Sequence, residues 1–349
     1  MKNSPHLILT VDYEIFGNGS GNIDCCVIKP AASMLAITER FHAPITFFVE
    51  TLEFIALEQS ADMKKGVKQI REQLSKAIGS GHDAQLHIHP QWHNAKYLSN
   101  GTWKLDLDRW RIGDLEEHQV TDLIQRGKSW LEELLQPVKE SYSCNTFRAG
   151  GWCIQPSEVV INAMRKNGIE IDSTVAPGFR NSTKGAWSDF RNAPDKSHWR
   201  VVSNVCIPAK SGIWEVPIIT GKINRLRHMQ AIKSSRSMDN GGMAKGCCGS
   251  YKGPDSKLQA TLGEVGKLLR LGHVMLDFST MPADVLIDIT THWLARYSDS
   301  THPVPIVAIA HTKNFTTASA DALNTYLEWA HVNHIQFSTY WQWLDEVNA

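Results

Sequence analysis

The stretch HLILTVDYE, His6 to Glu14, is a run of apolar residues that ends in two acids. A continuous apolar run with branched side chains predicts a strand buried on both faces, which is typical of parallel sheets covered by helices. Four further runs share this character: PITFFVE (44–50), DAQLHIH (83–89), NTFRAG (145–150) and PVPIVAIAH (303–311). The chain therefore predicts a sheet with several buried, mostly parallel strands.

Segments with the apolar spacing of amphipathic helices lie between these runs. They cover residues 31–41, 64–82, 116–135, 157–168 and 321–333. Strands that alternate with helices predict an α/β fold whose mostly parallel sheet is open or closed into a barrel. With 349 residues and 42% hydrophobic content, the chain can bury a large core, so we expect a single domain over residues 1–349.

Residues 176–260 interrupt this alternation. They are rich in turn-forming residues and show little apolar periodicity, so we predict a long irregular loop insertion. Its segment 221–260 carries eight Lys or Arg against two acids. This basic segment could be a solvated loop, or an electropositive rim that attracts phosphate or pyrophosphate.

The overall charge is balanced, with 36 Lys and Arg against 36 Asp and Glu. Nothing global attracts nucleic acid or an anionic membrane, so we expect no nucleic-acid partner. The N-terminus lacks the apolar core of a secretory signal, and no window approaches the roughly eighteen apolar residues that a membrane helix needs. We therefore expect a soluble, cytoplasmic protein that is not an integral membrane protein.

Two of the predicted strands end in pairs of metal-binding side chains. Asp12 and Glu14 are two residues apart, so strand alternation places them on one face. In LHIHPQWH, His87 and His89 have the same spacing and could bind one cation together. His93 follows His89 by four residues, which is the spacing of a pair on one face of a helix. The two geometries compete as interpretations of this histidine cluster.

Three further reactive side chains stand where predicted strands end: Arg148 in NTFRAGGW, Asp172 in GIEIDSTVAPG and His311 in VPIVAIAHTKNF. In parallel α/β folds, the carboxyl ends of the strands build the active site. An arginine there can orient a carboxylate, and a histidine can act as a general acid. Each residue alone is more often structural, but their common position favours a functional site.

The order of these motifs resembles that of the polysaccharide deacetylase family, also called the NodB-homology domain or carbohydrate esterase family 4. The similar segments are LTVDYE, PITFFVE, GHDAQLHIHPQWH, FRAGGW, GIEIDSTVAPG and IAHTKNF, and they extend over roughly residues 5–175 and 270–345. The resemblance implies a distorted (β/α) barrel. The segments LHIHPQW, FRAGG and DSTVAPG also look like a divergent branch associated with lipopolysaccharide and O-antigen biosynthesis.

Two departures from the family pattern concern the metal site. The family's first motif has two adjacent aspartates, a base and then a metal ligand, whereas Tyr13 occupies the second place here. Asp12 aligns with the base and Glu14 is the nearest replacement carboxylate, so the two roles could be exchanged. The family's second histidine would fall on Gln91, which is a poor ligand, so His89 is the expected replacement.

The resemblance implies a hydrolase that uses one divalent metal ion, preferably Zn²⁺. We expect the metal ligands to be Asp12, His87 and His89, with His93 as the alternative ligand. Such an ion polarises an amide carbonyl and activates water for attack. The implied catalytic residues are Glu14 as the base, Arg148 and Asp172 as orienting residues, and His311 as the acid that protonates the leaving amine.

Two tryptophans, Trp92 and Trp152, lie next to motifs and are candidates for stacking on a sugar ring. A cytoplasmic location favours a nucleotide-linked or lipid-linked N-acyl amino sugar, acetylated or formylated, as the substrate. This substrate would be an intermediate of surface polysaccharide biosynthesis. The alternatives are a hydrolase of a non-sugar amide and, if the departures at Tyr13 and Gln91 mean a lost metal, a catalytically silent carbohydrate-binding or assembly protein.

Overall fold

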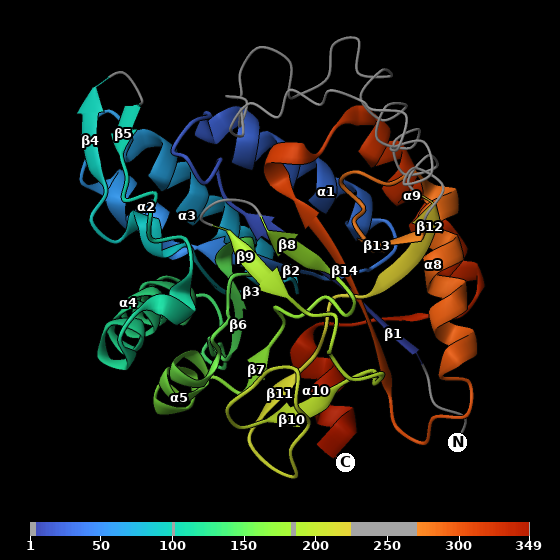
Figure 1. The fold of residues 1–349 in the computed structure, drawn as a ribbon. Helices are drawn as coiled ribbons and strands as arrows, with labels where there is room; N and C mark the ends of the chain where they lie inside the picture. Colours follow the sequence, from blue (N-terminus) through green and yellow to red (C-terminus); the bar gives the residue numbers. More distant parts are fainter. Residues whose placement is uncertain (1–4, 100–101, 183–185, 225–270, 349) are drawn as a thin grey trace, which may run out of the picture.

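The structure, a computed structural model, describes residues 5–99, 102–182, 186–224 and 271–348. Every predicted strand forms within these ranges, as β1 (Pro5–Tyr13), β2 (Ile45–Glu50), β3 (Asp83–Ile88), β6 (Thr146–Ala149) and β14 (Val304–His311). Nearly all residues of these strands are buried, because protein covers both faces of the sheet. The apolar runs thus form the core of the molecule (Figure 1).

The main sheet has nine strands in the order β10-β11-β7-β6-β3-β2-β1-β14, with β15 (Gln336–Phe337) paired to β1. The strands from β11 (Ile213–Glu215) and β7 (Ile171–Asp172) through to β14 pair in parallel, whereas β10 (Trp199–Val201) is antiparallel to β11. The carboxyl ends of the parallel strands therefore meet at one edge of the sheet. This is the edge where the predicted site residues lie.

Helices lie around this sheet and return the chain to the start of each strand (Figure 1). The α-helices are α1 (Lys29–Glu39), α2 (Thr51–Glu58), α3 (Lys64–Gly79), α4 (Glu117–Leu135), α5 (Glu158–Lys166), α8 (Ala283–Arg296), α9 (Thr317–Val332) and α10 (Tyr340–Asn348). Short helical segments of other types span Asp24–Ile28, Pro90–Trp92, Ile112–Asp114, Gly150–Trp152 and Thr312–Asn314. Within the described ranges, no helix combines the length and the apolar character that crossing a bilayer requires.

The chain after β11 links the two ends of the sheet. The amide of Ile218 donates to the carbonyl of Val175, at 2.8 Å, on the β7 side. The next amide, of Ile219, donates to the carbonyl of Val307 in β14, at 3.1 Å. The curled, mostly parallel sheet is therefore a distorted (β/α) barrel, as the sequence predicts.

The segment predicted as an irregular insertion, 176–260, contains more regular structure than we expected. Its described part holds β8 (Arg180–Ser182), β9 (Trp187–Asp189), β10, β11 and β12 (Thr220–Asn224). Strands of three to five residues carry too few side chains for an alternation to be recognised in the sequence, and β10 and β11 belong to the main sheet itself. Residues 225–260, which hold most of the basic segment, lie outside the described residues.

Two-stranded sheets lie beside the main one in the described part of the chain. They pair β4 (Lys96–Ser99) with β5 (Thr102–Lys104), β8 with β9, and β12 with β13 (Leu271–Met275). The hairpin of β4 and β5 follows the histidine motif directly. Its Trp103 packs against Trp92 at a ring-centroid distance of 5.4 Å, so this hairpin covers one side of the core.

Candidate metal and catalytic site

The strand register brings the predicted site residues together. Asp12 in β1 is paired with His311 in β14, and His87 in β3 is paired with Arg148 in β6. His87 is also paired with Glu50, the last residue of β2. Because parallel strands end at one edge, residues far apart in the sequence become neighbours there.

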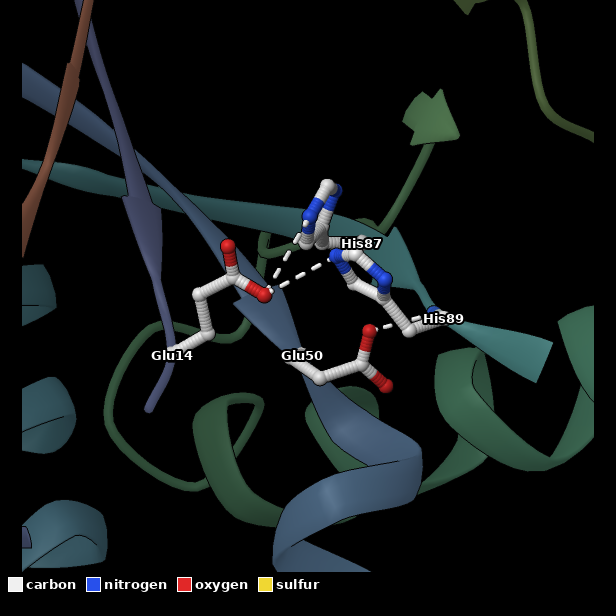
Figure 2. A group of neighbouring side chains, drawn as sticks. All are labelled: Glu14, Glu50, His87 and His89. Carbon is white, nitrogen blue, oxygen red and sulfur yellow. Dashed lines mark hydrogen bonds and ion pairs between the residues drawn. The ribbon is translucent and has the colours of Figure 1, made fainter. Parts of the chain in front are cut away.

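The carboxylate of Glu14 faces both histidines of the motif (Figure 2). Its Oε2 is 3.0 Å from Nε2 of His89 and 3.8 Å from Nε2 of His87. None of these three buried atoms has a hydrogen-bond partner among the described residues, and the closer contact is an ion pair when His89 is protonated. A carboxylate oxygen and two imidazole nitrogens thus face one another, which is a donor set that a cation can bind.

Asp12 is placed differently from the predicted triad of Asp12, His87 and His89. Its Oδ2 lies 3.9 Å from Nε2 of His87 but 3.4 Å from Nε2 of His311. The acid that is close to both histidines is Glu14, because it extends beyond the end of β1. The geometry therefore favours the exchanged arrangement, in which Glu14 rather than Asp12 completes the histidine pair.

Both histidine rings are held from their outer side. Nδ1 of His87 lies 2.9 Å from the carbonyl of Arg148, and since a carbonyl only accepts, this nitrogen donates and leaves Nε2 with its lone pair. Nδ1 of His89 lies 3.1 Å from the amide nitrogen of the buried Gln91. Gln91 stands where the family pattern has its second histidine, and it contacts the ring of His89, the residue expected to replace that ligand. The carbonyl contact of His87 is of the kind that orients metal-binding imidazoles. The amide nitrogen of Gln91 instead donates to Nδ1 of His89, which leaves the proton of that ring on Nε2, facing Glu14.

The glycine of the arginine motif is required by the ring of His89. A Cβ atom on Gly150 would lie 2.4 Å from Cγ of His89, a distance that real Cβ atoms do not adopt. The group that approaches the backbone at Gly150 is thus the imidazole of His89. The FRAGG segment thus forms one wall of the histidine pocket.

Lys313 is the cationic partner of Glu14. Its Nζ lies 2.6 Å from Oε1, the oxygen that points away from the histidines. Burial raises the pKa of Glu14, but Lys313 first and then His89 and His87 outweigh it, so the pKa is well below its usual value. Burial lowers the pKa of His87 to about 4. Near neutral pH, Glu14 is thus a charged carboxylate that lies beside the uncharged imidazole of His87.

Arg148 is completely buried and fully engaged. Its Nη1 donates to Oδ1 of Asp12 at 2.7 Å, its Nε to the carbonyl of Ser173 at 2.9 Å, and its Nη2 to Oγ1 of Thr10 at 3.0 Å. A planar guanidinium held at three points fixes the carboxylate that it contacts. Arg148 therefore holds the carboxylate of Asp12 in place, and its role in catalysis stays a prediction.

The charge of Asp12 follows from these neighbours. Burial raises its pKa, whereas Arg148, then His87 and then His311 lower it, and the net effect is a pKa below the usual value. His311 is the more accessible partner, with 13% of its side chain exposed. Asp12 and His311 therefore form a carboxylate–imidazole pair that solvent and ligands can reach from the side of His311.

Asp172 does not contact the pair of Asp12 and His311 among the hydrogen bonds and ion pairs of the described residues. Its Oδ1 accepts from Oγ1 of Thr174 at 2.6 Å, and it is paired with Glu215 across β7 and β11. Among the hydrogen bonds of the described residues, the groups that hold Arg148 are Ser173 and Thr10 rather than Asp172. Asp172 therefore makes no hydrogen bond to Arg148 among the described residues, and its orienting role stays a prediction.

His93, the alternative ligand, lies outside the cluster. The helical segment Pro90–Trp92 turns the chain, and Nδ1 of the exposed His93 lies 3.3 Å from Nη1 of Arg126 in α4. Trp92 is 1% exposed and packs in the core, so it is not available to stack on a sugar. Trp152 is partly exposed, and its ring lies 5.9 Å from that of His311. It is the predicted aromatic residue that remains at the site.

Two buried glutamates are part of the site although no role was predicted for them. Glu50 lies with Glu14, His87 and His89 in a group whose candidate ligand atoms are all within 4.8 Å of one another. Glu53 lies three residues further on, in the first turn of α2, and accepts a hydrogen bond from the amide of Ile15. The acid that ends PITFFVE was a usable signal for Glu50, since it stands at a strand end like the other acids.

The donor set fits a divalent metal ion. Two imidazole nitrogens and one carboxylate oxygen are the protein ligands found at many zinc centres that keep a position open for water or substrate. The three facing atoms of Glu14, His87 and His89 are buried without hydrogen-bond partners, and a bound cation would satisfy them. The structure thus contains a buried Glu/His cluster that could hold one ion.

Comparisons with known proteins bear on the fold. No protein-family model and no curated protein matches the chain. A protein assigned as a polysaccharide deacetylase from Mycobacterium smegmatis superposes with a TM-score of 0.52 at 12% identity, covering 100% of this chain and 91% of that one. The Puue allantoinase gives 0.51 at 11%, covering 99% and 90%. A 4-alpha-glucanotransferase from Thermococcus litoralis gives 0.53 at 11%, covering 99% of this chain and 40% of that one.

At these identities, the likeness concerns the fold. The chain shares the distorted (β/α) barrel fold of the protein assigned as a polysaccharide deacetylase. Membership of the lipopolysaccharide-associated branch stays a prediction from the sequence motifs.

Proposed function

We propose that this protein is a metal-dependent amide hydrolase that removes an N-acyl group, acetyl or formyl, from an amino sugar. The observation that carries the proposal is the meeting of Glu14, His87 and His89, whose facing atoms are buried without hydrogen-bond partners. Beside them lies the carboxylate–imidazole pair of Asp12 and His311, which forms a second group of possible metal ligands together with Glu14. A metal site and an acid–base pair at one sheet edge are the parts that amide hydrolysis needs.

We assign Glu14, His87 and His89 as the metal ligands and Asp12 as the base. A divalent ion, preferably Zn²⁺, would polarise the scissile carbonyl and make water more acidic there. Asp12 keeps its negative charge through Arg148, so its Oδ2 can accept a proton from the attacking water. His311, whose Nε2 faces the same oxygen, can then give a proton to the leaving nitrogen.

An amino sugar fits the surroundings of His311. The ring of Trp152 lies 5.6 Å from that of Phe179 and 5.9 Å from that of His311, so aromatic surface adjoins the proposed acid. Aromatic faces suit the apolar faces of sugar rings. We propose a nucleotide-linked or lipid-linked N-acyl amino sugar of lipopolysaccharide or related surface polysaccharide biosynthesis, used in the cytoplasm. The resemblance of the motifs and the basic segment 221–260 support this choice.

The test is a metal analysis of protein purified without an affinity tag, together with amine release from a panel of N-acetyl and N-formyl sugars linked to nucleotides. We expect one divalent ion per chain and metal-dependent release from at least one substrate. A His87→Ala variant should lose both the ion and the release. Full metal content and normal turnover in His87→Ala would contradict the proposed site.

One observation favours a second function. Lys313 already neutralises Glu14 at 2.6 Å, so the carboxylate has a cationic partner without any metal ion. A catalytically silent carbohydrate-binding or assembly protein could keep its cleft intact through this ion pair. Saturable sugar binding by wild-type protein that takes up no zinc would support this alternative.

A further inference from the structure

The junction of β2 and α2 places two carboxylates behind the proposed metal ligands. Glu50 is the last residue of β2, Glu53 lies in the first turn of α2, and both side chains are 0% exposed. Within the described residues, neither forms an ion pair with a lysine or an arginine, although other acids of this site do. Buried carboxylates without a cationic partner are costly, and proteins usually pair them or use them with metals.

Each of these carboxylates holds the backbone at a proposed ligand. Oε2 of Glu50 accepts a short hydrogen bond from the amide of His89 (Figure 2). Glu53 accepts from the amide of Ile15, which directly follows Glu14, at 3.1 Å and 3.3 Å for its two oxygens. The acids Glu50 and Glu53 thus fix the two chain segments whose side chains meet at the candidate ion.

Burial and the nearby Glu14 raise the pKa of both Glu50 and Glu53 well above the usual value. The hydrogen bonds that these two acids accept, rather than their charge, are therefore what they contribute to the site.

We infer that Glu50 and Glu53 are positioning residues of the metal centre, which hold the backbone segments of His89 and Glu14. This inference rests on the proposed function. It concerns residues that do not need to touch the substrate. Outer residues that orient metal ligands typically change metal affinity by roughly 10- to 100-fold when they are replaced.

Glu53 allows the carboxyl group and the hydrogen bond to be separated. Both of its oxygens accept from the same amide, so Glu53→Gln can keep an acceptor for Ile15 while it removes the carboxyl group. Glu53→Ala removes both, and Glu53→Asp keeps the carboxyl group. Glu50 is less separable because Oε1 accepts from Leu52 and Oε2 from His89, so Glu50→Gln turns an amide group toward one of these donors.

The experiment measures the Zn²⁺ dissociation constant of the full chain by competition with a chromophoric chelator. We expect Glu53→Ala, which removes the acceptor for Ile15, to weaken zinc binding by about 10- to 100-fold, and Glu53→Gln, which keeps an acceptor, to stay closer to the wild-type constant. We expect Glu53→Asp to bind more tightly than Glu53→Ala. The control is Glu328→Gln in α9, an exposed residue away from the sheet edge, which should keep the wild-type constant. Thermal unfolding of the metal-free variants identifies any that do not fold.

The outcomes separate this inference from the proposed function. Stoichiometric zinc in the wild type, with an unchanged constant in folded Glu53→Gln and Glu53→Ala, would overturn the positioning role and leave the proposed function standing. A wild-type protein that binds no zinc would contradict the proposed function itself. Equal weakening in folded Glu53→Gln and Glu53→Ala would contradict a role that depends on the acceptor for Ile15.

Discussion

Asp12 and His311 are paired in register on adjacent parallel strands, and Nε2 of the histidine lies 3.4 Å from Oδ2 of the aspartate. Glu14, two residues after Asp12, passes beyond the strand end and lies against His89 instead. The register of β1 and β14 therefore places Asp12 against His311, whereas Glu14 lies against His89. Because both acids come from the same short segment, conservative variants can test this difference directly.

The first prediction separates the base from the ligand. Asp12→Asn should lower turnover by about 100-fold or more while it keeps stoichiometric zinc, because it removes a proton acceptor and not a ligand. Glu14→Gln should lose zinc as well as activity. Metal content by mass spectrometry and amine release by a fluorogenic reagent check both. The reverse pattern, with zinc lost only in Asp12→Asn, would restore the triad of Asp12, His87 and His89.

The second prediction concerns the histidine motif. His93→Ala should keep the wild-type zinc content, because the structure places His93 beside Arg126 on the outer side of the motif. His89→Ala should lose zinc, since its Nε2 faces Glu14. Equal zinc loss in the two variants, measured on protein with unchanged circular dichroism, would argue against the assignment of His89.

The third prediction contrasts two tryptophans. Trp152→Ala should raise KM for the sugar substrate and leave zinc content unchanged, because its partly exposed ring adjoins His311. Trp92→Ala should instead lower the free energy of unfolding by about 3–5 kcal/mol, as expected for a large aromatic residue removed from a core. Chemical denaturation and steady-state kinetics distinguish the two effects. An unchanged KM in Trp152→Ala would remove it from the substrate site.

The fourth prediction uses the acid pair of Asp172 and Glu215. Burial raises the pKa of Asp172 to about 6, and burial followed by Asp172 raises that of Glu215 well above its usual value. The folded state therefore holds protons that the unfolded state has released. This stabilisation is complete below the unfolded pKa values and is lost as the pH rises through about 6.

Glu215→Gln removes one of these two acids, so the free energy of unfolding of the variant should increase relative to that of the wild type as the pH rises. A pKa shift of one unit corresponds to about 1.4 kcal/mol. We expect the variant to gain on the order of 1–2 kcal/mol relative to wild type between about pH 5 and about pH 8. Thermal melts of both proteins at these two pH values check it. A difference in Tm that does not depend on pH would show that the pair is not protonated in the folded state.

Much of the fold could be predicted from the sequence, because long apolar runs such as 303–311 identify buried strands and their alternation with helices sets the parallel order. The strands β10 and β11 could not, since three residues carry no periodic signal. The site residues followed from strand ends, which share one edge in a parallel sheet. The spacing could not determine how far each side chain reaches. This reach decides which of Asp12 and Glu14 lies closer to the pair of His87 and His89.

Context outside the motifs accounts for the other differences. Trp92 adjoins the histidine motif in sequence, yet packing against Trp103 of the following hairpin buries it. The ion pair between Lys313 and Glu14 forms because β14 lies next to β1, which places the ammonium group of Lys313 at Glu14. Glu53 is one of two acids in the short, largely buried helix α2, and only the position of Ile15 shows that it contacts the loop after β1.

The most direct test of the metal centre is anomalous diffraction at the zinc absorption edge from crystals of the tag-free protein. We predict one peak in the space bounded by Oε2 of Glu14 and Nε2 of His87 and His89. A peak between Asp12 and His311 instead, or no peak from protein supplied with excess zinc, would contradict the assignment.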